Sequence, residues 1–226
     1  MPTGAPAKLV LYSNANWNSP YVLSAFVGLT EKKLPFEVQE VALHEGAQRA
    51  PAYVETSFTA RVPALVDGAF SLSESSAIVE YLEDKWPPPA HVALLPRDLE
   101  ARARARQVMA WVRSDLMPIR EERSAEYVFY PHDGLAPYAP LSPAALRALE
   151  KLVGFAGRVV PAGGGPLFGA WSIADTDLAM MLQRLVKTNQ PLPAHLKTFA
   201  EREWQRPSVQ AFVNAPRPPF RPALTW

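Results

Sequence analysis

The sequence predicts an α/β domain followed by an all-helical domain. Strand-like and helix-like patterns alternate over residues 1–86, a proline-rich stretch interrupts them at 87–97, and residues 98–226 have helical periodicity almost throughout. A chain of 226 residues is also long enough for two domains that each bury a core. We therefore expect a small helix-covered sheet, a linker and an all-α domain with these boundaries.

The predicted first domain has the order β-α-β-(weak α)-β-β-α. Its strands are short runs of apolar or alternating residues, and its two clear helices repeat apolar residues at helical spacing. Asp67-Gly68 separates two strand-like runs and favours a tight hairpin turn. We expect strands at 9–12, 36–41, 62–66 and 69–72, and helices at 20–31 and 73–86.

The predicted second domain follows Pro87-Pro88-Pro89, because three consecutive prolines cannot continue a helix. Residues 124–141 hold several prolines and aromatic residues, which indicates a long loop. Ser172 and Asp175 have the spacing of a capping box, which is a folding signal at a helix start. We expect helices at 98–123, 142–160, 173–187, 195–205 and 208–213.

Composition excludes several classes of function. The 23 lysines and arginines nearly balance the 22 aspartates and glutamates, so no global charge attracts nucleic acid or an anionic membrane. Without cysteine, the chain has no disulfide, thiolate zinc site or cysteine nucleophile, and any thiol chemistry must use the thiol of a ligand. The four histidines lack metal-ligand spacing, so we expect no metal site. No stretch has the character of a signal peptide or a spanning helix, which favours a cytoplasmic protein.

Asn18-Ser19-Pro20-Tyr21 lies between the first predicted strand and the first predicted helix. Serine followed by proline is typical of a helix start, so Ser19 could simply be the N-cap. The same position offers a second role, because free N–H groups and the helix dipole favour an anion there. The hydroxyl of Ser19 could then donate to a bound thiolate.

Arg61-Val62-Pro63-Ala64-Leu65 places a proline at the start of a predicted strand. An ordinary edge-strand proline would explain this position, and so would a cis peptide bond before Pro63. A cis proline would turn the N–H and C=O of Val62 outward, where an extended ligand could form a short antiparallel ladder with them.

Ser73-Glu74-Ser75-Ser76 opens the second clear helix of the first domain. Serine at such a position is an ordinary start signal, although no capping box is present because residue 76 is not Glu or Gln. A glutamate beside free N–H groups could instead bind an amino-acid head group. Glu74 would then take the ammonium, and Ser75 with the backbone would take the carboxylate.

Three stretches together resemble the cytosolic glutathione transferase superfamily. They are LVLYSNANWNSPYVLSAFVGL, RVPALVDGAFSLSESSAIVEYLEDKW and FGAWSIADTDLAM, and the resemblance covers essentially the whole chain. It looks closest to a bacterial serine-type branch near the theta and zeta classes. It implies a thioredoxin-like first domain that holds glutathione as co-substrate, an all-helical domain that forms the electrophile pocket, no covalently bound cofactor, and a homodimer.

The resemblance also implies roles for individual residues. Ser19 takes the catalytic place and favours the thiolate of glutathione over the thiol. The implied glutathione-binding residues are Val62 beside Pro63 for the cysteinyl unit, Glu74 and Ser75 for the γ-glutamyl group, and Arg61 and Gln48 for the glycyl carboxylate.

The loop from Tyr12 to Ser19 is longer than in many serine-type relatives. Other polar side chains of this loop could therefore share or replace the role of Ser19, namely Ser13, Asn16 and Asn18. Helix position suggests Trp111, Arg113 and Met117 for the electrophile pocket, together with Trp17 from the loop.

The activity that the resemblance implies is conjugation of glutathione to a small hydrophobic electrophile, with reduction of organic hydroperoxides as a side activity. Detoxification and protection from oxidative stress are the corresponding roles. Two alternatives stay open. One is a non-catalytic glutathione-binding or protein-interaction module of the same fold, and the other is a glutathione-dependent isomerase or dehalogenase.

Overall fold

A computed structural model describes residues 8–130, 135 and 137–222 of the chain. The chain divides into two compact units, and each is described by itself. The first unit comprises the described residues of Met1–Val92 and Ala215–Trp226, and the second comprises those of Ala93–Asn214. The last described segment thus groups with the α/β part of the chain.

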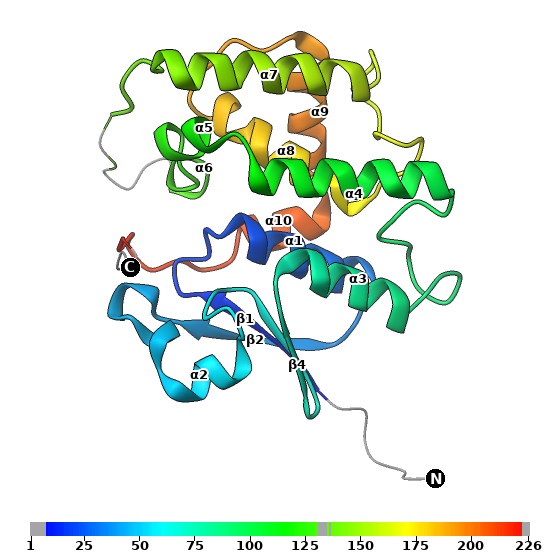
Figure 1. Ribbon diagram of the computed structural model, residues 1–226, viewed down its shortest axis with the longest axis vertical. Helices are drawn as coiled ribbons and strands as arrows, with labels where there is room; N and C mark the ends of the chain where they lie inside the picture. Colours follow the sequence, from blue (N-terminus) through cyan, green and yellow to red (C-terminus); the bar gives the residue numbers. More distant parts are fainter. Residues whose placement is uncertain (1–7, 131–134, 136, 223–226) are drawn as a thin grey trace. The chain divides into compact units, whose positions relative to one another are not determined.

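The first unit contains a four-stranded mixed sheet with the order β2-β1-β3-β4 (Figure 1). The β1 strand pairs with β2 in parallel and with β3 antiparallel, and β3 pairs with β4 antiparallel. A hairpin joins β3 and β4 as predicted, but its two loop residues are Gly68 and Ala69 and not Asp67 and Gly68, because Asp67 still pairs with Phe70; Gly68 has φ 63°. The strands are β1 (Leu9–Asn14), β2 (Phe36–Val41), β3 (Ala64–Asp67) and β4 (Phe70–Ser73).

Helices complete this unit in the predicted order. The α1 and α3 helices pack side by side against the sheet, and α2 lies away from that pair (Figure 1). Apolar side chains from β1, α1, β3 and α3 form a core that water does not reach, including Leu11, Leu23, Leu65 and Ile78. The helices are α1 (Pro20–Glu31), α2 (Pro51–Thr56) and α3 (Ser75–Lys85), and two 3₁₀ turns, η1 (Leu43–Glu45) and η2 (Ala47–Arg49), precede α2.

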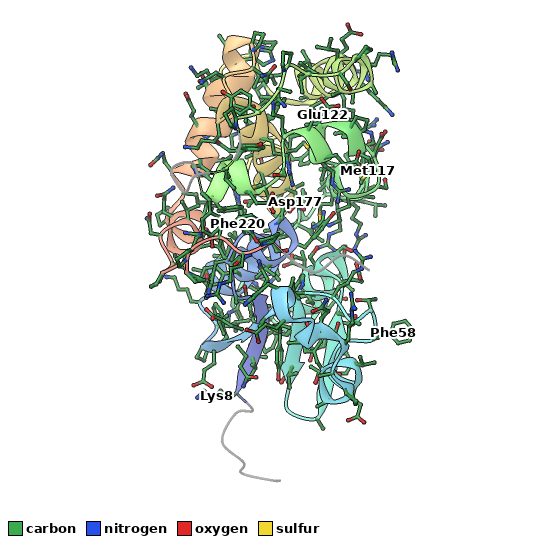
Figure 2. The ribbon with its side chains drawn as sticks, turned by 90° about the vertical axis from the view of Figure 1, so that its left-hand side faces the viewer. Lys8, Phe58, Met117, Glu122, Asp177 and Phe220 are labelled. Carbon is green, nitrogen blue, oxygen red and sulfur yellow. The ribbon has the colours of Figure 1, made fainter. Side chains whose placement is uncertain are left out.

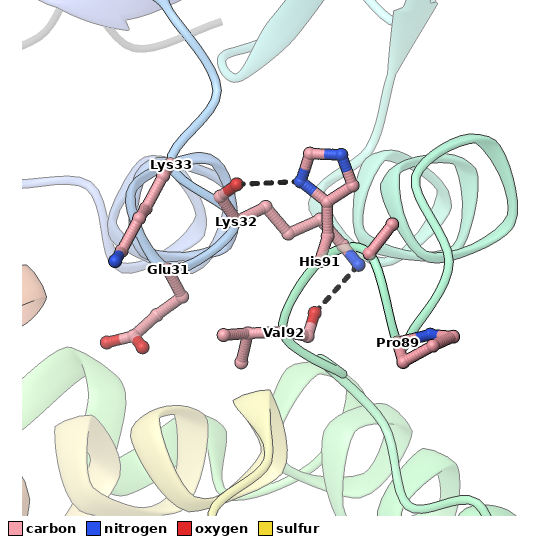
Figure 3. Close-up of a pocket in the computed structure, with 7 residues that line it drawn as sticks. Glu31, Lys32, Lys33, Pro89, His91 and Val92 are labelled. Atoms are coloured by element: carbon pink, nitrogen blue, oxygen red, sulfur yellow. Dashed lines mark hydrogen bonds between the residues drawn. The ribbon is translucent and has the colours of Figure 1, made fainter.

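Lys32, just beyond α1, makes a buried polar junction that the sequence patterns do not indicate. Its ammonium donates to Glu83 Oε2 at 2.8 Å, to the Trp86 carbonyl at 2.8 Å and to the Val92 carbonyl at 2.9 Å. His91 Nδ1 lies 3.0 Å from the Lys32 carbonyl (Figure 3). Three acceptors satisfy a charge that would otherwise be costly to bury, so Lys32 ties the ends of α1 and α3 to the segment that follows them.

The second unit is helical, as predicted. Its central helix is α8, whose residues from Ile173 to Leu185 are all buried and which packs against α4 and α9 (Figure 1). The predicted capping box is present: Asp175 Oδ2 accepts from the Ser172 N–H and hydroxyl, each at 2.9 Å. The helices are α4 (Leu99–Ser114), α5 (Met117–Glu122), α6 (Glu126–Phe129), α7 (Pro143–Val159), α8 (Ile173–Val186), α9 (Ala194–Trp204) and α10 (Pro207–Val213).

Two predictions for the second unit are wrong in detail. The single helix expected over 98–123 is broken at Leu116, which has a left-handed φ of 63° and donates its N–H to Asp115 Oδ1 at 2.7 Å. The expected loop over 124–141 contains the short helix α6, because Val128 and Phe129 find buried positions there. Residues 131–134 and 136 of that predicted loop lie outside the described residues.

Among the residues that the structure describes, none of the helices combines the length and the apolar character needed to cross a bilayer.

Candidate functional site

The sheet register brings three candidate segments to one edge of the first unit. Tyr12 of β1 lies opposite Ala64 of β3, and Ala64 lies opposite Ser73 of β4. The loop that leaves β1, the Val62-Pro63 segment that enters β3 and the Glu74-Ser75 segment that leaves β4 therefore all start at this edge. Residues far apart in the sequence can contact one ligand there.

Ser19 is the N-cap of α1, and Pro20 is the first residue of the helix. The half-buried Ser19 accepts a hydrogen bond through Oγ from the Val22 N–H at 3.3 Å. A hydroxyl that accepts one bond still has its own proton to donate. The capping role and the donor role, which the sequence presents as alternatives, are therefore compatible in this geometry.

The other polar residues between Tyr12 and Ser19, at the end of β1 and in the β1–α1 loop, are buried. Ser13 has no exposed surface, and its hydroxyl donates to the Asn14 carbonyl at 3.1 Å. Asn14 Nδ2 donates to Asn18 Oδ1, and Asn16 Nδ2 donates to the Arg221 carbonyl at 2.6 Å. Ser13, Asn16 and Asn18 are each more than nine-tenths buried, whereas Ser19 is half-buried.

Trp17 completes this loop in an uncommon backbone conformation. Its φ of 48° lies in the left-handed region that non-glycine residues rarely adopt. Its Nε1–H donates to Glu40 Oε1 at 2.6 Å, and its ring meets the edge of the Phe26 ring with centroids 5.9 Å apart. Contacts to β2 and α1 therefore hold the loop.

The Val62–Pro63 peptide bond is cis, which is one of the two readings that the sequence left open. Arg61, which precedes Val62, is held by α2 and by the residue that follows α2. The Tyr53 and Ser57 hydroxyls each donate to the Arg61 carbonyl at 2.8 Å. Burial raises the pKa of Tyr53, so this hydroxyl stays protonated as a donor. Among the described residues, the backbone N–H and C=O of Val62 have no hydrogen-bond partner.

Glu74 is the N-cap of α3 and has φ 74° and ψ 117°, a conformation that favours glycine. Its side chain makes no capping hydrogen bond and is exposed, while Ser75 is buried beside it. The Glu74 carboxylate is thus exposed and not used to cap the helix that it begins, so it is available to a ligand.

Gln48 and Arg61 differ in their surroundings. Gln48 lies in η2 with 4% of its surface exposed, and its Oε1 has no hydrogen-bond partner among the residues described. Buried polar atoms without partners are rare in folded proteins. Arg61 is exposed, with its backbone N–H donating to Ser57 Oγ at 3.2 Å.

Three of the four candidates for the electrophile pocket lie in the second unit, and Trp17 lies in the first. Two of these three, Trp111 and Arg113, have side-chain partners within the second unit. Trp111 Nε1–H donates to Asp115 Oδ2 at 3.0 Å, and its ring packs on Phe155. Arg113 forms an ion pair with Asp177 at 2.7 Å, whereas Met117 is 44% exposed (Figure 2).

One surface depression of about 370 Å³ lies elsewhere in the first unit (Figure 3). Its lining includes Glu31, Lys33 and His91, at the opposite end of α1 from Ser19. It is therefore separate from the candidate site. Within the described part of the chain, no group of three or more His, Cys, Asp or Glu side chains is arranged to hold a metal ion.

The family comparisons match both parts of the chain. The N-terminal domain of glutathione S-transferases matches residues 18–85, and their C-terminal domain matches residues 98–216. Mouse glutathione S-transferase theta-1 is 36% identical over 91 residues, which are 40% of this chain and 37% of the relative. Glutathione S-transferase Z1 of Arabidopsis thaliana is 35% identical over 128 residues, or 57% and 56% of the two chains.

A third curated relative is a maleylpyruvate isomerase of Ralstonia, 36% identical over 112 residues, or 50% of this chain and 51% of the relative. The matched segments of these three relatives thus span from just over a third to somewhat more than half of the relatives' length.

Solved structures match over nearly the full chain. A glutathione transferase homologue from Burkholderia, solved with bound glutathione, is 43% identical, covers 91% of this chain and 96% of its own, and has a TM-score of 0.75. A theta class glutathione S-transferase from Xanthomonas axonopodis shares the fold, with 24% identity, a TM-score of 0.70 and coverage of 94% and 99%. With both domains matched and the fold shared, the chain belongs to the glutathione S-transferase family.

Proposed function

We propose that this protein is a serine-type glutathione transferase in which Ser19 activates the glutathione thiol. The observation that carries the proposal is the geometry of Ser19: its Oγ accepts from the Val22 N–H and keeps its own proton to donate. The half-buried Ser19 lies at the N-terminus of a twelve-residue helix, where the dipole favours a thiolate.

The rest of the tripeptide is held at the same sheet edge. The exposed Glu74 carboxylate pairs with the γ-glutamyl ammonium, and Ser75 with the α3 N-terminus receives the γ-glutamyl carboxylate. The N–H and C=O of Val62, beside Pro63, form a short antiparallel ladder with the cysteinyl unit. Gln48 and Arg61 are the candidates for the glycyl carboxylate.

Thiol activation of this kind is within reach of the groups present. Lowering the thiol pKa by about two units requires roughly 2.7 kcal/mol of preferential stabilisation of the thiolate. A hydrogen bond to a charged group contributes about 1.5–3 kcal/mol, and a helix N-terminus about 0.3–1 kcal/mol. One hydroxyl and one helix end are therefore sufficient.

The thiolate then acts on a small hydrophobic substrate. At an electrophilic carbon, the sulfur forms a thioether as the leaving group departs with its electron pair. At an organic hydroperoxide, the sulfur attacks the O–O bond, an alcohol leaves, and a second glutathione reduces the resulting sulfenic acid to yield glutathione disulfide and water. Met117, Trp17, Trp111 and Arg113 are the proposed candidates for the walls that hold this substrate.

A second candidate activity is glutathione-dependent isomerisation, which the similarity to the Ralstonia maleylpyruvate isomerase favours. It uses the same thiolate, which adds to an unsaturated substrate and leaves again after a bond rotation. We place either activity in a cytoplasmic homodimer with a role in detoxification or protection from oxidative stress.

The proposal is tested by measuring glutathione binding by calorimetry and turnover with a panel of aryl halides, cumene hydroperoxide and a cis-unsaturated diacid. The expected result is glutathione binding with glutathione-dependent turnover of at least one class. Binding without turnover of any substrate would favour the non-catalytic module, and no binding would overturn the glutathione site itself.

A further inference from the structure

We propose that the C-terminal segment Ala215–Pro222 is a strap that positions the β1–α1 loop for thiol activation, with Arg217 as its principal positioning residue. This inference rests on the proposed role of Ser19. The segment follows α10 in the chain but groups with the first unit, and it passes beside the start of α1 (Figure 1). Its hydrogen bonds to the β1–α1 loop join residues that are about 200 positions apart in the sequence.

Hydrogen bonds from both sides join the strap to the loop. Arg217 Nε donates to the Trp17 carbonyl at 3.2 Å, and Asn16 Nδ2 donates to the Arg221 carbonyl at 2.6 Å. Arg217 is itself oriented, because its NH1 donates to the Ala215 carbonyl at 3.1 Å. The strap therefore contacts the two residues of the loop that immediately precede Asn18 and Ser19.

The strap also contacts the segment that follows β2. Arg221 NH1 lies 3.4 Å from His44 Nε2 in η1. Trp17 reaches Glu40 of β2 through its indole N–H. The charged and titratable groups that contact the loop or the strap include Glu40, His44, Arg217 and Arg221, and the two guanidinium groups among these come from the strap.

The backbone of the β1–α1 loop adopts an unfavourable conformation that hydrogen bonds from the strap can stabilise. Trp17 has a φ of 48°, which a bulky residue keeps only where its surroundings over-determine it. In that conformation the Trp17 carbonyl accepts from Arg217, so the hydrogen bond favours the unusual backbone state directly. Because Ser19 follows two residues later, a rotation at Trp17 changes the direction of the Ser19 hydroxyl and the start of α1.

The proposal predicts a specific kinetic signature for Arg217→Met. Losing the guanidinium should raise the pKa of the enzyme-bound glutathione thiol by about one unit, which means about tenfold less thiolate below that pKa. The turnover number at neutral pH should fall by a similar factor, while glutathione affinity stays within about twofold, since the tripeptide is held mainly by other segments.

The matched variants separate positioning from other effects. Arg217→Gln keeps an N–H donor without the charge and should stay close to the wild-type thiol pKa. Arg147→Met removes an exposed arginine of α7 and should leave the thiol pKa unchanged. If Arg217→Met does not fold, Arg217→Ala removes the same hydrogen bond with a smaller side chain.

The measurement is a pH titration of the ultraviolet thiolate absorbance of bound glutathione, run beside thermal unfolding. A raised thiol pKa in Arg217→Met, rescued in Arg217→Gln, supports the strap. A variant that loses thermal stability with an unmoved thiol pKa, or equal effects in Arg217→Met and Arg217→Gln, would overturn it. If instead the wild-type protein leaves the pKa of the glutathione thiol unchanged, the proposed function itself fails, which is a different result.

Discussion

Glu74 combines an exposed carboxylate with a backbone conformation that glutamate rarely adopts. Its φ of 74° and ψ of 117° cost on the order of 1–3 kcal/mol for a residue with a Cβ. The side chain does not cap α3 in return. A residue that is strained and unused by the fold is a strong candidate for ligand binding, which agrees with the proposed pairing with the γ-glutamyl ammonium.

Glu74→Ala should weaken glutathione binding by more than tenfold, because the ligand's ammonium loses its charged partner. Glu74→Gly should bind as weakly as Glu74→Ala but unfold at a higher denaturant concentration, since glycine tolerates the positive φ. Calorimetry and urea unfolding measure the two effects.

Glu55→Ala, at an exposed position of α2, is the control for loss of a surface carboxylate. Unchanged glutathione affinity in Glu74→Ala would remove Glu74 from the site. A Glu74→Gly variant no more stable than Glu74→Ala would show that the positive φ at position 74 does not cost folding free energy.

Single-residue predictions succeed where the signal is local. Serine before proline predicts the N-cap at Ser19, and the cis bond before Pro63 was among the two readings of its sequence context. The positive φ of Trp17 and Glu74 has no such signal, because neither residue favours that region. Contacts with other segments of the chain decide the backbone conformations of these two residues.

At the level of elements, periodicity predicts the helices and strands well, whereas neighbouring strands and side-chain hydrogen bonds decide where they end. The strand β1 continues to Asn14 because β2 supplies parallel partners up to Val41. The helix expected over 98–123 is interrupted because the Asp115 carboxylate accepts a hydrogen bond from the Leu116 N–H. Competition of this kind depends on side-chain direction, which hydrophobic spacing does not encode.

The junction between α8 and α9 holds two buried carboxyl groups. Glu203, 4% exposed, accepts from Arg202 at 3.1 Å, and its Oε2 has no hydrogen-bond partner in the described ranges. Burial, reinforced by the negative charge of Asp175, raises the pKa of Glu203 above its ordinary 4.5. Burial also raises the pKa of Asp175, against the hydrogen bonds that it accepts.

This arrangement makes stability depend on pH with a defined sign. The folded protein holds the Glu203 proton more tightly than the unfolded chain, so the contribution of Glu203 is full below pH 4.5 and is lost as pH rises through the folded-state pKa. Glu203→Gln should therefore flatten the decrease of the unfolding free energy above pH 4.5 and preserve stability at pH 7.

Urea unfolding of both proteins across this pH range tests the prediction. The control is Glu201→Gln, which changes an exposed carboxylate of the same helix. Equal pH dependence in wild type and Glu203→Gln would show that Glu203 is not the group that titrates.

At the scale of the whole molecule, the order of elements was predictable and two long-range ties were not. Local periodicity and the proline interruption indicate an α/β part followed by a helical part, and the structure has both. The buried Lys32–Glu83 pair and the strap that reaches Asn16 from Arg221 join residues 51 and 205 positions apart. Each of these contacts depends on how helices and strands pack after they have formed, so no short stretch of sequence predicts it.

The candidate site shows the same division. Its segments were recognisable one by one, and the sheet register through Tyr12, Ala64 and Ser73 brings them to one edge. Helix position alone suggests the candidates of the helical unit, and in the structure Trp111 and Arg113 have partners within that unit. The position of a residue along a helix predicts the face on which its side chain lies, but it does not predict which neighbouring side chains contact that face.

The proposed stabilisation of the glutathione thiolate by the Ser19 hydroxyl is tested most directly by titrating the bound thiol in wild type, Ser19→Ala and Ser13→Ala. We expect a wild-type thiol pKa well below that of free glutathione and a return toward the free value in Ser19→Ala. Glutathione affinity should be nearly unchanged, and lost capping should cost only about 1 kcal/mol of stability. Ser13→Ala should leave the thiol pKa in place. A thiol pKa unmoved by Ser19→Ala, or moved instead by Ser13→Ala, would show that the Ser19 hydroxyl does not stabilise the thiolate.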